Sequence, residues 1–134
     1  MKKLLCMLLA LLAIGSCALA ETENATDEAV LNIFTWEGYI DYETVIKPFE
    51  QETGIKVIYE TFETNEDMYA KIAMGGSSYD VIIPSDYMIE RMIQENLLQK
   101  INWENIPNVA NIDPRFMNEN YDPQSEYSVP YTWG

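Results

Sequence analysis

Short apolar segments alternate with segments of helical periodicity from residue 31 onward. Residues 31–36, 55–60 and 80–83 have the composition of strands, and a helix is expected after each of them. Strands that alternate with helices across short connections are typical of βαβ units, in which the strands run parallel. The pattern therefore predicts an α/β fold with a largely parallel sheet.

Each expected helix has a recognisable start or end. Residues 42–53 place apolar side chains at helical spacing and stop at Gly54, which suits a left-handed C-cap. Pro48 lies inside this segment and predicts a helix in two pieces, because proline disrupts a helix interior. The next two helices are expected over residues 65–74 and 87–96, with Asn65 and Asp86 as their N-caps.

Two residue groups that could suggest metal sites have simpler interpretations. Asn65-Glu66-Asp67 is typical of helix capping and of acids near the positive end of the helix dipole, so no calcium site is expected there. No metal ion or other cofactor is expected elsewhere. Four methionines are interpreted as core or interface packing and not as copper ligands: Met68, Met74, Met88 and Met92.

The last third of the chain has no sustained periodicity. Residues 102–124 are rich in Asn, Pro and Asp, which predicts a packed loop with short helical turns. Residues 127–133 (YSVPYTW) look extended, and the sequence stops directly after this aromatic segment. Because three strands look like half a sheet, we expect the sequence to be truncated.

Residues 1–20 have the pattern of an export signal. Lys2 and Lys3 precede an apolar run over residues 4–14. A membrane-spanning helix needs about 20 apolar residues, so this run is too short to cross a bilayer.

Two cleavage interpretations of this signal compete. Ala18-Leu19-Ala20 fits release of a soluble chain that starts at Glu21, which is marginally preferred. The run Ile14-Gly15-Ser16-Cys17 instead fits a lipobox, with Cys17 carrying a lipid anchor. Both place the protein outside the cytoplasm, in the periplasmic space or at the outer face of the cell membrane. Both also leave residues 21–30 as a flexible acidic leader.

Charge and missing residue types narrow the function classes. Without Lys2 and Lys3, six basic and 22 acidic residues leave a net charge of −16, which repels nucleic acid and attracts cations. The chain has no histidine, and both cysteines lie in the signal. These absences exclude catalysis by Ser-His-Asp or Cys-His groups within this chain, and the common zinc sites.

Aromatic and acidic residues follow the first and third predicted strands. Ligands of open parallel sheets bind outside the carboxyl ends of the strands. Aromatic faces attract an organic ammonium group by about 0.5–2 kcal/mol each, and a carboxylate gives it a charge-assisted hydrogen bond. The same residues could instead cap the core, and Asp86 could be only an N-cap. The candidate ligand-binding residues are Trp36, Glu37, Tyr39, Ser85 and Tyr87.

Four segments of the chain resemble the spermidine/putrescine-binding proteins of polyamine ABC importers. They are LNIFTWEGYI, FEQETGIKVIYETFETNEDMYAKI, SSYDVIIPSDY and EYSVPYTWG, in this order. The resemblance covers residues 31–134. It implies a type II periplasmic-binding-protein fold with two lobes that close on the ligand, of which residues 31–134 would be the first lobe, ending near the first crossover.

The resemblance also carries functional expectations. The binding aromatics of the family match Trp36 and Tyr39 after the first strand, and a serine and an aromatic after the third strand match Ser85 and Tyr87. It implies a monomer that is not an enzyme, and that delivers polyamines to the membrane permease of an ABC importer. Most of the acids that neutralise the ligand in the family would lie beyond this sequence.

One departure from the family pattern bears on the ligand. The family usually has Trp, a small residue, an acid and then Tyr, whereas this chain has Trp36-Glu37-Gly38-Tyr39. Glu37 is therefore a weaker candidate, and the choice between putrescine and spermidine stays open. Two alternatives are a binding protein for an amino acid, opine or sugar, and an exported hydrolase that uses paired carboxylates.

Overall fold

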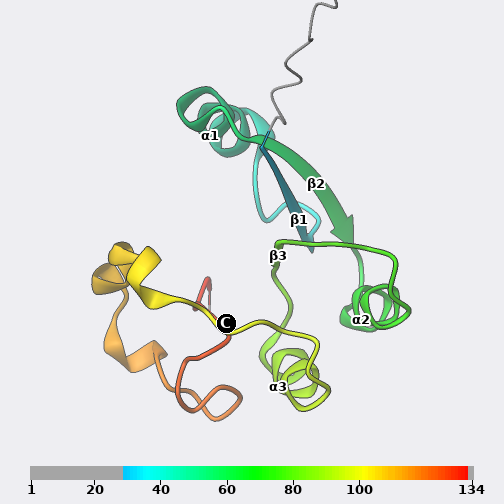
Figure 1. Ribbon diagram of the computed structural model, residues 1–134, viewed down its shortest axis with the longest axis vertical. Coiled ribbons are helices and arrows are strands. Elements are labelled where there is room, and N and C mark those ends of the chain that lie inside the picture. The colour runs from blue at the N-terminus through cyan, green and yellow to red at the C-terminus, as the bar shows by residue number, and fades with distance from the viewer. Residues whose placement is uncertain (1–28, 133–134) are drawn as a thin grey trace, which may run out of the picture.

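The computed structural model describes residues 29–132 and contains a parallel three-stranded sheet (Figure 1). The strands are ordered β2-β1-β3, and both pairs are parallel, as predicted. The predicted signal with both cleavage sites, residues 21–28 of the predicted leader, and residues 133–134 lie outside the described residues. Val30, the last residue of the predicted leader, belongs to the first strand. The strands are β1 (Val30–Trp36), β2 (Lys56–Phe62) and β3 (Val81–Ile82).

The register brings the carboxyl ends of the strands to one edge of the sheet. β1 and β2 pair along their whole length, so Trp36 lies opposite Phe62 where both strands end. β3 pairs with β1 only through Val81 and Ile82 and is therefore shorter than the predicted strand over residues 80–83.

The first helical segment has two pieces, as Pro48 predicts. A π-helix, η1 (Tyr42–Ile46), leads into α1 (Lys47–Thr53), and Pro48 lies in the first turn of α1, where its missing N–H is tolerated. Gly54 ends α1 with φ of 70°, in the left-handed region that glycine adopts without steric cost.

The next two helices begin one residue earlier than their predicted caps imply. α2 (Asn65–Ala73) is capped by Thr64, whose hydroxyl accepts a hydrogen bond from the Asp67 N–H at 3.1 Å. α3 (Asp86–Gln94) has Ser85 at its N-cap position. The predictions of Asn65 and Asp86 as N-caps are therefore wrong, because Thr64 and Ser85 already occupy the extended position before each helix.

The core lies between one face of the sheet and helices α2 and α3. Phe34 packs edge-on against Phe62, with ring centroids 5.0 Å apart, and stacks on Tyr79 at 4.6 Å. Three of the four methionines predicted to pack are buried here, whereas Met74 is 80% exposed at the end of α2 and is not part of this core. The buried cluster comprises Phe34, Phe62, Met68, Met88 and Met92.

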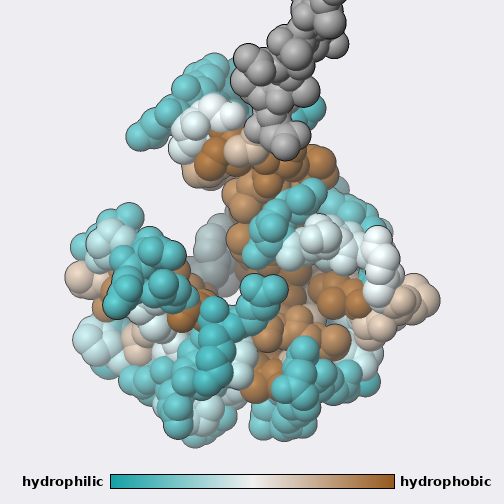
Figure 2. Space-filling model, in the orientation of Figure 1, coloured by the Kyte–Doolittle hydropathy of each residue, from teal (hydrophilic) through white to brown (hydrophobic). Residues whose placement is uncertain are grey.

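Part of the sheet remains open to solvent. Figure 2 shows apolar surface gathered over the strands, between the hydrophilic outer faces of the helices. Ile58 on β2 is 50% exposed, and Val30 and Val81 are also exposed. The sheet is therefore covered less completely than the βα pattern predicts.

The segment after α3 consists of loops and short helical turns, as predicted. Its 3₁₀ turns are η2 (Trp103–Asn105), η3 (Pro107–Asn111) and η4 (Pro114–Phe116). Residues 127–132 pair with no strand of the described sheet. None of the helices within residues 29–132 is long and apolar enough to cross a membrane.

The short pairing of β3 is extended by the Asp80 carboxylate. It accepts hydrogen bonds from the Asn32 backbone N–H at 2.7 Å and from Asn32 Nδ2 at 3.1 Å. These bonds, the backbone one first, hold the pKa of Asp80 below its ordinary value of 3.8. Because the folded-state pKa is depressed, this stabilisation is present above pH 3.8 and is lost as the pH falls below it.

We expect Asp80→Asn to lower the free energy of unfolding by under about 1 kcal/mol at neutral pH, because the carboxylate is exposed. The difference between wild type and variant should shrink as the pH falls below 3.8, because the depressed pKa means that the carboxyl takes up its proton there. Urea unfolding across this pH range measures it. If the difference in unfolding free energy between wild type and variant grew as the pH fell, the stabilising hydrogen bonds of the ionised Asp80 carboxylate would be contradicted.

Candidate ligand-binding site

Trp36 lies on the border between the core and the carboxyl ends of the strands. Its ring centroid is 4.7 Å from that of Phe62, which is buried, and Trp36 itself is half-buried. One part of the indole therefore packs on the core while the remainder faces the edge of the sheet.

A tight turn brings Tyr39 back beside Trp36. Gly38 adopts φ of 77°, and the Tyr39 N–H donates to the Trp36 carbonyl at 3.3 Å. The two rings lie 6.4 Å apart. The structure thus brings together the two aromatic residues predicted after the first strand.

Tyr131 adds a third ring that the candidate set lacks. It stacks on Tyr39 at 5.8 Å, and its hydroxyl donates to the Tyr39 carbonyl at 2.8 Å. The sequence did contain a signal for this residue, because residues 127–133 are rich in aromatic side chains and lie in a segment that carries the family resemblance. The contact itself joins residues 92 positions apart and could not be read from the sequence.

Ser85 and Tyr87 form a second group at the start of α3, together with two residues from α2. Asn65 accepts from the Ser85 N–H at 3.1 Å through Oδ1 and donates through Nδ2 to the Tyr87 hydroxyl at 2.9 Å. The Tyr87 hydroxyl in turn donates to Glu66 at 3.0 Å. The side chain of Tyr87 is half exposed, at 50%, whereas Asn65 is only 4% exposed.

The two groups are joined through β2. Phe62, which packs on Trp36, is the last residue of β2, and Asn65 opens α2 three positions later. Both groups therefore lie at the same edge of the sheet. From the sequence, Asn65 was interpreted as an N-cap and Glu66 as an acid that interacts with the positive end of the helix dipole. Their contacts with Ser85 and Tyr87 were not predicted.

Acidic side chains beside these groups carry no basic partner. Glu37 is exposed, and its carboxylate has no hydrogen bond or ion pair with any described residue. Asp86 accepts from the Tyr87 backbone N–H at 2.7 Å. The ion pairs of residues 29–132 use other acids, namely Glu43, Glu60, Glu95, Asp113 and Glu126. The site therefore has a negative potential that favours a cation.

The candidate residues form a wall along the strand-end edge of the sheet, apart from two hollows of this part of the chain. One hollow, lined by Tyr42, Glu50 and residues 54–57, lies where β2 begins, at the opposite edge of the sheet. Another lies beside the loop over residues 121–127 and Ile93. Neither of these two hollows is lined by Trp36 or Tyr87. Within the described residues, no cluster of acids has the arrangement of a metal site.

The family described as hypothetical lipoprotein (MG045 family) has a model that matches residues 1–115. The chain belongs to this family. The resemblance to spermidine/putrescine-binding proteins is also confirmed by sequence. The spermidine/putrescine-binding periplasmic protein of Salmonella typhimurium is 41% identical over 126 residues, which cover 92% of this chain and 36% of the relative. The putrescine-binding periplasmic protein SpuD of Pseudomonas aeruginosa is 39% identical over 129 residues, which cover 95% of this chain and 34% of the relative.

Solved structures agree on the fold. A putative spermidine/putrescine ABC transporter protein from Listeria monocytogenes has a TM-score of 0.75 at 48% identity, covering 78% of this chain and 32% of that one. The PotD substrate-binding protein of Streptococcus pneumoniae has a TM-score of 0.74 at 47% identity, and the match covers 77% of this chain and 32% of that one. The predicted type II periplasmic-binding-protein fold is therefore confirmed, and the periplasmic relatives and lipoprotein family confirm an extracytoplasmic location. The chain spans about a third of the length of the curated relatives it matches.

Proposed function

We propose that the complete protein captures polyamines, spermidine or putrescine, outside the cytoplasm and delivers them to the membrane permease of an ABC importer. The observation that carries this proposal is the row of aromatic rings beside unpaired carboxylates at the carboxyl ends of the strands. The matched relatives are substrate-binding proteins of transport systems, two of them named for spermidine and putrescine or for putrescine alone. Accordingly, the protein binds its ligand without transforming it.

The chemistry of the wall suits a flexible diamine. Alkyl amines have a pKa of about 10.4 and are charged at neutral pH. The faces of Trp36 and Tyr39 would attract an ammonium group and cover the methylenes beside it. Glu37, Ser85 and the hydroxyl of Tyr87 would accept its hydrogen bonds, with the charge-assisted bond to Glu37 the strongest.

The candidate residues at the strand ends form only one side of a binding site, and a second surface is needed to enclose the ligand. We place residues 31–134 in the first lobe of a monomer whose remaining part closes over the strand ends by a hinge motion. The coverage of about a third of the relatives' length supports this arrangement. The lipoprotein description of the family also favours a lipid anchor at Cys17 over cleavage after Ala20, which reverses the preference drawn from the sequence.

Calorimetric titration of the complete protein tests the function. We expect saturable binding of putrescine or spermidine, weakened by added salt because part of the attraction is Coulombic. A panel of amino acids, an opine and a sugar serves as the control. A folded protein that binds a member of this panel and neither polyamine would contradict the proposal.

A further inference from the structure

We propose that Asn65 and Glu66 determine the ligand class of this site, by removing hydrogen-bond donors from the start of α3 so that the site accepts amines and rejects carboxylates. This inference rests on the proposed function and concerns the same strand-end surface. Neither residue needs to touch the ligand, and both would act through Ser85 and Tyr87.

The orientation of the Asn65 amide follows from its partners. The Ser85 backbone N–H can only donate, so the amide atom that faces it at 3.1 Å must be the oxygen. The amide nitrogen then faces the Tyr87 hydroxyl at 2.9 Å and donates to it. Since Asn65 is 4% exposed, this arrangement is shielded from water.

The Asn65 donation sets the direction of the Tyr87 hydroxyl. The phenol oxygen accepts from Asn65, and its proton goes to Glu66 Oε1 at 3.0 Å. A hydroxyl has one proton and two lone pairs, so one lone pair remains for a ligand. Tyr87 can therefore accept a hydrogen bond from an ammonium group but has no proton left for a carboxylate.

Two backbone donors at the same place are also occupied. A helix N-terminus usually attracts anions through its free N–H groups. Here the Ser85 N–H donates to Asn65, and the Tyr87 N–H donates to the Asp86 carboxylate at 2.7 Å. The Glu66 and Asp86 carboxylates add negative charge beside them. An anionic ligand group would thus find two of these donors occupied, and two carboxylates that repel it, where other helix starts offer a binding site.

The test compares putrescine with 4-aminobutyrate, which replaces one ammonium end by a carboxylate. We expect Asn65→Ala in the complete protein to weaken putrescine binding about tenfold and to reduce the preference for putrescine by about the same factor. It frees the Ser85 N–H and releases the Tyr87 hydroxyl. Thermal unfolding of each variant checks that it is folded.

Three further variants keep the test decisive if Asn65→Ala does not fold. Asn65→Asp retains the acceptor for Ser85 and adds a negative charge beside Tyr87, so it should raise the preference for putrescine where Asn65→Ala lowers it. Glu66→Gln retains an acceptor for the Tyr87 proton but loses its charge, and should reduce the preference by about threefold. Glu63→Gln removes an equal charge from an exposed position before α2, and should leave the preference unchanged.

The double variant Asn65→Ala/Tyr87→Phe separates positioning from general destabilisation. If Asn65 acts through the hydroxyl, its effect on putrescine affinity should largely disappear in the Tyr87→Phe background. Putrescine binding with an unchanged preference in folded Asn65 and Glu66 variants would overturn this inference alone. Failure of the wild-type protein to bind any polyamine would overturn the proposed function and this inference with it.

Discussion

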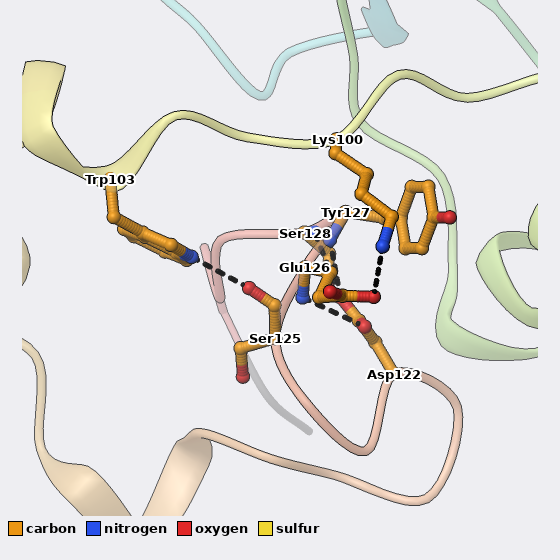
Figure 3. A network of polar contacts seen from close by, with 7 residues as sticks. All are labelled: Lys100, Trp103, Asp122, Ser125, Glu126, Tyr127 and Ser128. Atoms are coloured by element: carbon orange, nitrogen blue, oxygen red, sulfur yellow. Dashed lines mark hydrogen bonds and ion pairs between the residues drawn. The ribbon is translucent and has the colours of Figure 1, made fainter.

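Asp122→Ala is expected to lower the free energy of unfolding by about 4 kcal/mol, because it removes a buried carboxylate and leaves four part-buried donors without their acceptor. The Asp122 carboxylate is 4% exposed. It accepts from the backbone N–H groups of Glu126, Tyr127 and Ser128 at 3.0, 2.9 and 2.9 Å, and from the Ser128 hydroxyl at 2.9 Å (Figure 3).

The loop that Asp122 organises is tied to the segment after α3. The Trp103 indole N–H donates to the Ser125 carbonyl at 2.8 Å, and Lys100 forms an ion pair with Glu126 at 2.8 Å (Figure 3). Beyond this loop the chain returns to the sheet, where Tyr131 stacks on Tyr39. Loss of Asp122 should therefore loosen the third ring of the candidate site as well as the loop.

Urea unfolding followed by tryptophan fluorescence measures this effect. Asp122→Asn keeps one acceptor oxygen and should cost roughly half as much. Asp113→Asn is a control, since Asp113 caps a short turn at the surface and pairs with the exposed Arg115, and it should cost far less than Asp122→Ala. Equal losses for the Asp122 and Asp113 variants would show that the buried network does not stabilise the loop.

Trp36→Ala in the complete protein is expected to weaken putrescine affinity about 100-fold, in the range typical of a buried aromatic anchor. Trp36 is the first ring of the row Trp36, Tyr39 and Tyr131, and it contributes a large aromatic face beside Glu37. Because Trp36 also packs on Phe62, the substitution should cost about 2 kcal/mol of stability as well.

Titration calorimetry and thermal unfolding separate these two effects. Trp36→Phe retains an aromatic face and the core contact, so it should recover much of the affinity. Tyr42→Ala removes an exposed ring from η1, away from the strand ends, and should change affinity less than about twofold. A folded Trp36→Ala protein that binds putrescine within threefold of wild type would remove Trp36 from the site.

The local elements could be predicted because their signals are local. Alternating apolar segments predicted the three strands, Pro48 predicted the division between η1 and α1, and Gly54 predicted the end of α1. The N-caps were displaced by one residue, because Thr64 and Asn65 are both good capping residues and only the backbone shows which one is extended.

The exposed positions could not be read from periodicity. Met74 has the apolar character of a core residue, yet it lies at the end of α2 and is exposed. Ile58 lies on a sheet face that the described residues leave open. Burial depends on what packs against a residue, and the sequence pattern of one element does not contain its neighbours.

By itself, the sequence determined the α/β class, the parallel sheet and the strand ends at which Trp36, Tyr39, Ser85 and Tyr87 lie, because periodicity and turn residues act over a few positions. The tertiary structure alone decided which side chains meet there. Asn65 reaches Ser85 and Tyr87 across about 20 residues, and Tyr131 reaches Tyr39 across 92. Such contacts arise from the register of the strands and the path of the last loop, so no local signal predicts them.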